Sequence, residues 1–185
     1  MRAIDHAIFY AINRWPDALS TFFVGLSECT KWLPMRIFLV LLFLGLVWQK
    51  STRRTAILTI IAFPLANETT DIFKASLRVL RPCVELPDVI LRVEKLTSFG
   101  TASAHSANMA AVATVFWWTM GWRWGLPWAI IAFLTGISRV FVGVHYPTQV
   151  VFGWTCGIAI ASAVIAVAEA IKKRRTPTAE PSVES

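Results

Sequence analysis

The chain has 185 residues, of which 56% are hydrophobic and 16% charged, and it contains nine Trp. About a quarter of the residues of a soluble domain are charged, so this composition excludes an ordinary soluble protein. The net charge of +7 would suit nucleic acid, but much of the excess lies in short loops and near one end, where membrane proteins carry topology signals. The length and the long uncharged runs predict an all-α, polytopic membrane helix bundle with one domain and no nucleic-acid partner.

Residues 1–31 do not form a good spanning segment. Apolar residues between Ile4 and Ile12 lie on one side of a helix that also carries charged residues, and a second short apolar stretch covers residues 18–26. We expect two interfacial or partly embedded N-terminal helices here. In the alternative, the second stretch begins a longer spanning helix.

Five further apolar runs are long enough to cross a bilayer. They cover residues 33–49, 55–73, 103–122, 128–142 and 150–171. We therefore expect about five transmembrane helices, within a membrane domain of residues 1–171. A basic tail, residues 172–185, follows and is expected to be disordered because it is polar and rich in Pro, Ser and Glu.

The basic loops predict an orientation. Five spans place the loop at 50–54, the turn at Arg123 and the run at 172–175 on one side, and these segments hold eight Lys or Arg. By the positive-inside rule that side, with the C-terminus, is cytoplasmic. The polar clusters at 74–82, 102–105 and 139–145 then lie together on the opposite side, away from the cytoplasm.

The second span continues into an unusual polar stripe. Residues 67, 71, 74, 78 and 81 are polar and fall on one face of a continuous helix, and Glu68 lies beside them. Such a stripe must face protein or a water-filled cavity. An ion-coupled transporter would also use intramembrane charges, but the chain lacks the inverted repeats and broken-helix signals of that class.

Three short motifs bring together the groups needed to handle phosphate. Cations hold a phosphoryl group, and imidazoles attack it or protonate its leaving oxygen. The motifs are Lys74 with Arg81-Pro82, then Ala102-Ser103-Ala104-His105, then Ser138-Arg139 followed by His145 and Gln149.

Each of these residues has a plainer explanation when taken alone. Arg139 could be a snorkelling interfacial residue, His145 a hydrogen-bonded loop residue, and Lys74 the ion-pair partner of Asp71 or Glu68. Their joint occurrence on one side of the membrane favours the phosphate site.

In this order the motifs resemble the signature of the type 2 phosphatidic acid phosphatase superfamily, KxxxxxxRP, PSGH and SRxxxxxHxxxD. The resemblance implies an integral-membrane hydrolase of lipid phosphate monoesters or diphosphates that uses no metal and no cofactor. The substrates considered are undecaprenyl diphosphate, lipid A phosphate, phosphatidylglycerol phosphate and phosphatidic acid. The small size of the chain fits the first two best.

The resemblance also implies a role for each matching position. His145 would attack phosphorus and form a phosphohistidine, and His105 would be the general acid for the leaving oxygen. The remaining site residues would bind the phosphoryl oxygens or support the site: Lys74, Arg81, Ser103, the Ala104 N–H, Arg139 and Ser138.

The sequence departs from the signature at three positions. Ala102 and Ala104 replace Pro and Gly and are also small. Gln149 replaces the Asp that orients the nucleophilic histidine; its carbonyl can fix the tautomer but carries no charge. Two hypotheses follow. Either Asp71 or Glu68 supplies the missing charge, or the chain is a catalytically impaired homologue that binds phospholipid or a partner.

Overall fold

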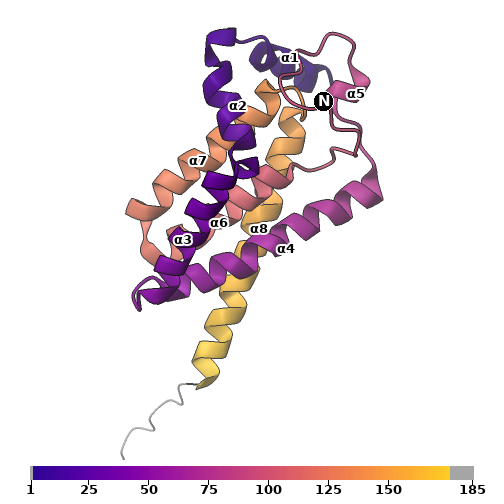
Figure 1. Cartoon of the computed structure of the whole chain (residues 1–185). Helices are drawn as coiled ribbons and strands as arrows, with labels where there is room; N and C mark the ends of the chain where they lie inside the picture. Colours follow the sequence, from indigo (N-terminus) through magenta and orange to yellow (C-terminus); the bar gives the residue numbers. More distant parts are fainter. Residues whose placement is uncertain (1, 176–185) are drawn as a thin grey trace, which may run out of the picture.

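The protein is a bundle of helices, with no strand among residues 2–175, which the computed structural model describes. Two short helices come first, α1 (Arg2–Asn13) and α2 (Ser20–Glu28), each followed by a 3-10 turn (Asp17–Leu19 and Cys29–Lys31). The long helices are α3 (Leu33–Trp48), α4 (Arg53–Leu77), α6 (Ala104–Met120), α7 (Trp122–Phe141) and α8 (Pro147–Arg175). Short α5 (Pro82–Glu85) lies in the connection between α4 and α6 (Figure 1). The predicted all-α membrane bundle is confirmed.

The five long helices occupy the five predicted spans, but they differ in their capacity to cross a bilayer. Among the described residues, α7, α8 and the stretch Arg53–Glu85 are long and apolar enough. The segment Asp17–Lys31 and α3 qualify only as one span bent by 66°. Helix α6 has 17 residues and is about 25 Å long. It packs against α4, α7 and α8, so it is shielded by the other helices.

Local chemistry explains where the helices of the site begin and end. Ser103 caps α6, because its Oγ accepts a hydrogen bond from the N–H of Ser106 at 3.3 Å. Pro82 and Pro147 occupy the first turns of α5 and α8, where a missing N–H costs nothing. Helix α4 ends because Arg78 adopts a left-handed conformation, with φ of 51°.

Helices α6 and α8 approach each other unusually closely. A Cβ at Gly157 would lie 2.1 Å from the Ala107 carbonyl oxygen, and one at Gly153 would lie 2.4 Å from the Ser103 carbonyl oxygen. Only glycine allows this contact, as is common between membrane helices. The contact fixes the start of α6 against the first turns of α8. It continues into an apolar core with α4: Leu58, Ala62, Ala66, Ala107, Ala111, Val115, Cys156, Ala161 and Ile165.

The N-terminal helices pack on the end of the bundle where α7 ends and α8 begins. Phe9 of α1 and Phe23 of α2 are buried in two apolar clusters there. The fully buried Asn13 side chain donates to the carbonyls of Ile90 and Phe141 at 2.9 Å each, and its Oδ1 accepts from the Ile90 N–H at 3.0 Å. These helices therefore form part of the protein core in addition to any contact with the bilayer.

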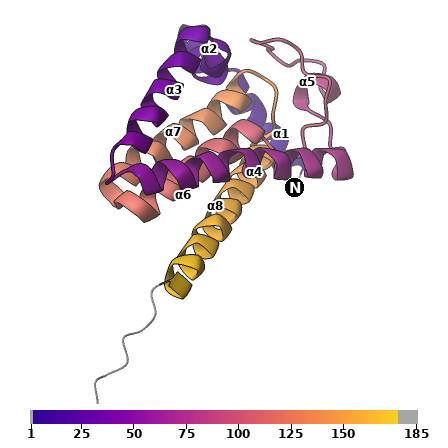
Figure 2. The same ribbon diagram turned by 60° about the horizontal axis from the view of Figure 1, so that its bottom comes forward.

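The two ends of the bundle differ. The α3–α4 and α6–α7 turns lie together at one end, and α1 and α5 lie toward the other (Figures 1 and 2). The basic residues 172–175 are helical rather than disordered, because they continue α8 as its last turn, where cations favour the helix dipole. The rest of the predicted tail, residues 176–185, lies outside the described residues.

Candidate active site

Three segments that are distant in sequence meet at the end of the bundle that carries α1 and α5. They are the connection after α4, the first turn of α6, and the α7–α8 loop with its flanking turns. Six predicted site residues from these segments are less than 5% exposed: Arg81, Ser103, Ser138, Arg139, His145 and Gln149. Burial of two guanidinium groups beside an imidazole is costly unless each is hydrogen-bonded.

The His145 ring is held from both sides. Its Nδ1 lies 3.0 Å from Gln149 Oε1, and its Nε2 lies 2.7 Å from Arg81 Nη1. Two further hydrogen bonds fix the orientation of the Gln149 side-chain amide. The Tyr146 N–H donates to Gln149 Oε1 at 3.2 Å, and Gln149 Nε2 donates to the Leu80 carbonyl at 2.8 Å. Because Oε1 can only accept, His145 carries its proton on Nδ1, which leaves a lone pair on Nε2.

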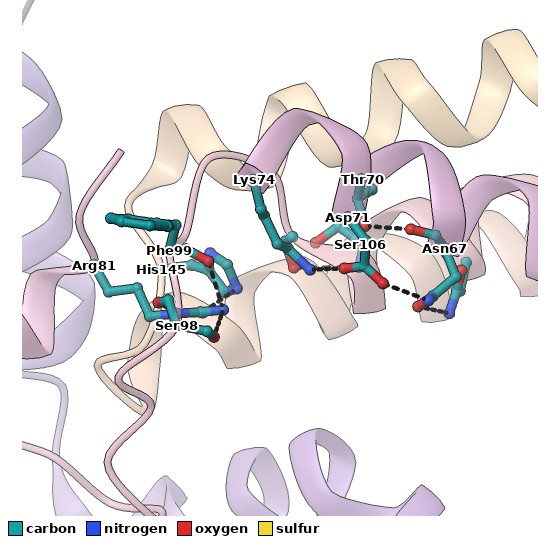
Figure 3. A network of polar contacts seen from close by, with 11 residues as sticks. Asn67, Thr70, Asp71, Lys74, Arg81, Ser98, Phe99, Ser106 and His145 are labelled. Carbon is teal, nitrogen blue, oxygen red and sulfur yellow. Dashed lines mark hydrogen bonds and ion pairs between the residues drawn. The ribbon is translucent and has the colours of Figure 1, made fainter. Parts of the chain in front are cut away.

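Arg81 is fastened by the loop around it. Its Nε donates to the Ser98 carbonyl at 2.7 Å, Nη2 donates to the Phe99 carbonyl at 3.2 Å, and Nη1 donates to the Val144 carbonyl at 3.1 Å. None of these partners is charged. The guanidinium therefore keeps its full positive charge beside the Nε2 atom of His145 (Figure 3).

Gly100 makes this arrangement sterically feasible. A Cβ at this position would lie 2.6 Å from Arg81 Cγ and 2.9 Å from Gln149 Oε1. A larger residue would therefore displace both groups that hold His145. Sequence reasoning had not singled out Gly100, because its importance arises from contacts with two remote segments.

Arg139 is held by α2. Its Nη1 donates to Ser27 Oγ at 2.5 Å and lies 3.4 Å from both the Ser27 carbonyl and Glu28 Oε1. Its Nε is buried without a hydrogen-bond partner. A buried donor without a partner is unusual and is consistent with a site that awaits an acceptor.

Lys74 points into the same region from α4. Its Nζ lies 2.7 Å from Asp71 Oδ1, and the other Asp71 oxygen accepts from Asn67 Nδ2 at 3.0 Å. In Figure 3, Lys74 lies between the Asp71 and Asn67 side chains on one side and the Arg81–His145 contact on the other. The prediction of one polar helical face from residue 67 to residue 81 was wrong, because α4 ends at Leu77. The chain turns there, so Arg81 reaches His145 from a loop.

The first turn of α6 supplies the remaining predicted groups. His105 is half-buried, and its ring makes no hydrogen bond to the described residues. Ser103 Oγ accepts the capping bond, which leaves its hydroxyl proton available for donation. The Ala104 N–H belongs to the first helical turn, whose amides have no partner within the helix. The positive end of the α6 dipole therefore faces this site.

The carboxylates predicted to replace the missing Asp do not reach His145. Asp71 contacts Lys74 and Asn67, and Glu68 is exposed. Ser138 Oγ donates to the Thr135 carbonyl of its own helix at 2.7 Å, so it supports α7 locally. Within residues 2–175, no group of three or more His, Cys, Asp or Glu is arranged to hold a metal ion.

The electrostatics favour the neutral form of the His145 imidazole. Burial is the largest factor that lowers the pKa of His145, which lies in the α7–α8 loop, and the positive charges of Arg81, Arg139 and Lys74 lower the pKa further. The hydrogen bond to Gln149 opposes this shift. The imidazole is therefore uncharged at neutral pH, which is the form that can attack an electrophile.

Fold and site together define an all-α membrane protein with a buried cluster of cations around an uncharged histidine. The model of the PAP2 superfamily matches residues 53–173, more than half of the chain. The chain therefore belongs to the PAP2 superfamily, which confirms the resemblance inferred from the three motifs.

Two relatives are similar to this chain in sequence, and one solved structure is similar to it in fold. An undecaprenyl-diphosphatase from Sulfolobus acidocaldarius is 31% identical over 127 residues, which is 68% of this chain and 58% of that protein. A decaprenylphosphoryl-5-phosphoribose phosphatase from Mycobacterium tuberculosis is 27% identical over 170 residues, 89% of each chain. The fold is similar to that of a transmembrane PAP2-type phosphatidylglycerolphosphate phosphatase from Bacillus subtilis, with a TM-score of 0.74, 23% identity, and coverage of 93% of this chain and 88% of that one.

Proposed function

We propose that this protein is a membrane lipid phosphatase that releases phosphate from a lipid phosphate or diphosphate through a phosphohistidine intermediate. The observation that carries the proposal is a buried series of two hydrogen bonds, which links Arg81 Nη1 to His145 and His145 to Gln149. It presents an uncharged imidazole nitrogen directly beside a fixed cation. A phosphoryl group needs both, because its transition state is stabilised mainly by positive charges around its oxygens.

The reaction would proceed in two steps. His145 Nε2 forms a bond to phosphorus while the bond from phosphorus to the leaving oxygen breaks, and protonated His105 gives its proton to that oxygen. Water then attacks phosphorus, His105 takes a proton from the water, and the N–P bond breaks to release phosphate. Lys74, Arg81, Arg139, Ser103 and the Ala104 N–H would hold the phosphoryl oxygens in both steps.

We infer a polyprenyl diphosphate, such as undecaprenyl diphosphate, as the preferred substrate class. The name of the Sulfolobus relative supports this choice, as does the absence of a large domain outside the bundle among the described residues. We also place the site on the periplasmic or extracellular side of a bacterial inner membrane, with the C-terminus in the cytoplasm. The support is the eight Lys and Arg in the loop at 50–54, the turn at 123 and the end of α8.

The test is a phosphate-release assay on the purified protein in detergent with EDTA present. The panel contains undecaprenyl diphosphate, lipid A phosphate, phosphatidylglycerol phosphate and phosphatidic acid. We expect release from undecaprenyl diphosphate that His145→Ala abolishes. The control His6→Ala changes the histidine that stacks on Tyr146, with ring centroids 5.2 Å apart, and should stay close to the parent rate.

Two results would overturn the proposal. Activity within about tenfold of the parent in His145→Ala would exclude this residue as the nucleophile, since loss of an attacking group removes its whole contribution. Lipid binding without phosphate release from any member of the panel would instead support the impaired homologue. Gln149 motivates that second candidate, because no described carboxylate contacts His145.

A further inference from the structure

Helix α2 reaches the phosphate-binding groups although it precedes the segment matched by the family model, residues 53–173. Its last turn supplies Ser27, which is 1% exposed, and Glu28, whose side chain is 17% exposed. Both contact Arg139, which follows more than a hundred residues later. Nothing in the three motifs requires such a contact.

The contacts use one part of the guanidinium and leave another free. Ser27 and Glu28 both engage Nη1. Nε is buried without a partner, and Nη2 makes no hydrogen bond to the described residues. The Nε–Nη2 edge of an arginine can bind two phosphate oxygens at once, and this binding mode depends on the orientation of the plane.

The charges of the neighbouring side chains explain why the Glu28 carboxylate can lie beside a phosphate-binding site. Glu28 Oε1 pairs with Arg139, and its other oxygen forms an ion pair with Lys31. Lys31 also lies within electrostatic range of His105. Lys74 is paired to Asp71, and Arg81 is bonded only to uncharged groups. The described charged groups around the site are therefore four cations and two carboxylates, an excess of two positive charges: Lys31, Lys74, Arg81 and Arg139 against Glu28 and Asp71. A bound phosphate monoester dianion would match that excess.

We propose that Ser27 and Glu28 are positioning residues that hold Arg139 by Nη1, so that its Nε–Nη2 edge is presented to the phosphoryl group. The inference rests on the proposed phosphate site. It makes α2 part of that site, because two residues of α2 fix the orientation of the Arg139 guanidinium. Lys31 neutralises the second oxygen of Glu28 and so limits repulsion between this carboxylate and the substrate.

The first test measures binding of inorganic phosphate, as the phosphate-dependent increase in thermal midpoint of the purified protein in detergent. Glu28→Ala should weaken phosphate binding about tenfold, because the guanidinium plane is no longer fixed. Glu28→Gln retains an acceptor oxygen and should stay within about threefold of the parent. The control Glu169→Ala breaks another interhelical Glu–Arg pair, with Arg54, and should leave phosphate binding unchanged.

A double-mutant cycle separates positioning from a general structural role. A lysine at position 139 has no planar edge to orient, so Glu28→Ala should have little further effect in the Arg139→Lys background. Additive losses would overturn the inference, and so would tighter phosphate binding by Glu28→Ala, which would make the carboxylate a competitor. Ser27→Ala is the substitute test in case Glu28→Ala does not fold. It removes only one hydroxyl and should weaken phosphate binding about threefold.

The same variants distinguish the two proposals. Arg139-dependent phosphate binding that needs Glu28, without phosphate release from any lipid, would contradict the proposed function and support the role of α2. Normal phosphate release by Glu28→Ala with unchanged kcat and KM would contradict the role of α2 and support the enzyme.

Discussion

Replacing Gln149 with glutamate tests the site most directly, because it exchanges one NH2 group for an oxygen and keeps the length of the side chain. In the parent, Gln149 Oε1 accepts from His145 Nδ1 at 3.0 Å and Nε2 donates to the Leu80 carbonyl at 2.8 Å. The Gln149→Glu variant keeps the first contact and adds a negative charge to it. It removes the donor for Leu80, the residue that precedes Arg81.

The expected size of the effect follows from these two bonds. A hydrogen bond between neutral groups contributes about 1 kcal/mol, and one to a charged group contributes about 1.5–3 kcal/mol. The imidazole becomes positive as it attacks, so a gain of about 1–2 kcal/mol in the transition state should raise kcat about 5- to 30-fold. The Leu80 carbonyl loses its donor, and since it is only partly buried this should lower stability by about 1 kcal/mol.

The assay is the pH dependence of phosphate release, with the thermal midpoint measured in parallel. A carboxylate beside His145 raises the pKa of the imidazole, so the acid limb of kcat/KM should move to higher pH in Gln149→Glu. Asp71→Asn should have the same effect in the parent and in this variant, because Asp71 contacts Lys74 and not His145. An unchanged acid limb with an unchanged or lower kcat would refute the nucleophile assignment for His145.

Three further results are expected. His105→Ala should slow lipid phosphates more than nitrophenyl phosphate, because a general acid matters most for a basic leaving oxygen; equal losses would make His105 a binding residue. Gly100→Ala should lower kcat/KM at least about tenfold by displacing Arg81, whereas Gly45→Ala, with no atom near its added Cβ, should not. The acid limb of the parent should lie below pH 6.5, since burial and nearby cations lower the pKa of His145; a midpoint at or above 6.5 would contradict this.

Hydropathy predicted which segments are helical but not how each one ends or packs. The stripe from residue 67 to residue 81 suits a continuous helix, yet α4 stops at Leu77. Two bonds from the following loop favour the turn: the Val79 N–H donates to Thr101 Oγ1 at 3.1 Å, and its carbonyl accepts from the Gly100 N–H at 2.8 Å. These partners lie more than twenty residues away, so local periodicity contains no signal for them.

The motifs identified most of the residues around His145 because their side chains have the chemistry that phosphate requires. The partners of those residues could not be found in this way. Ser27 and Glu28 directly follow the short apolar stretch at 18–26, which was interpreted only as an interfacial or partly embedded helix. Their contact with Arg139 depends on how α2 packs on α7. The contacts do not support the compensation hypothesis for Asp71, because its carboxylate is used by Lys74 and Asn67. The pair with Lys74 is the plainer explanation that the sequence had already offered for that lysine.

The relative position of the two histidines depends on helix packing more than on loops. Gly153 and Gly157 bring α8 against the start of α6, and the Ser103 N–H donates to the Gln149 carbonyl at 3.0 Å across that contact. The segment that carries His105 is therefore bonded directly to the residue that orients His145. Side chains held by packed helices are positioned more precisely than side chains on free loops. In the proposed reaction, phosphate binding would require mainly an exchange of partners at Arg81 Nη1, from the imidazole nitrogen to a phosphoryl oxygen, while the helices keep their places.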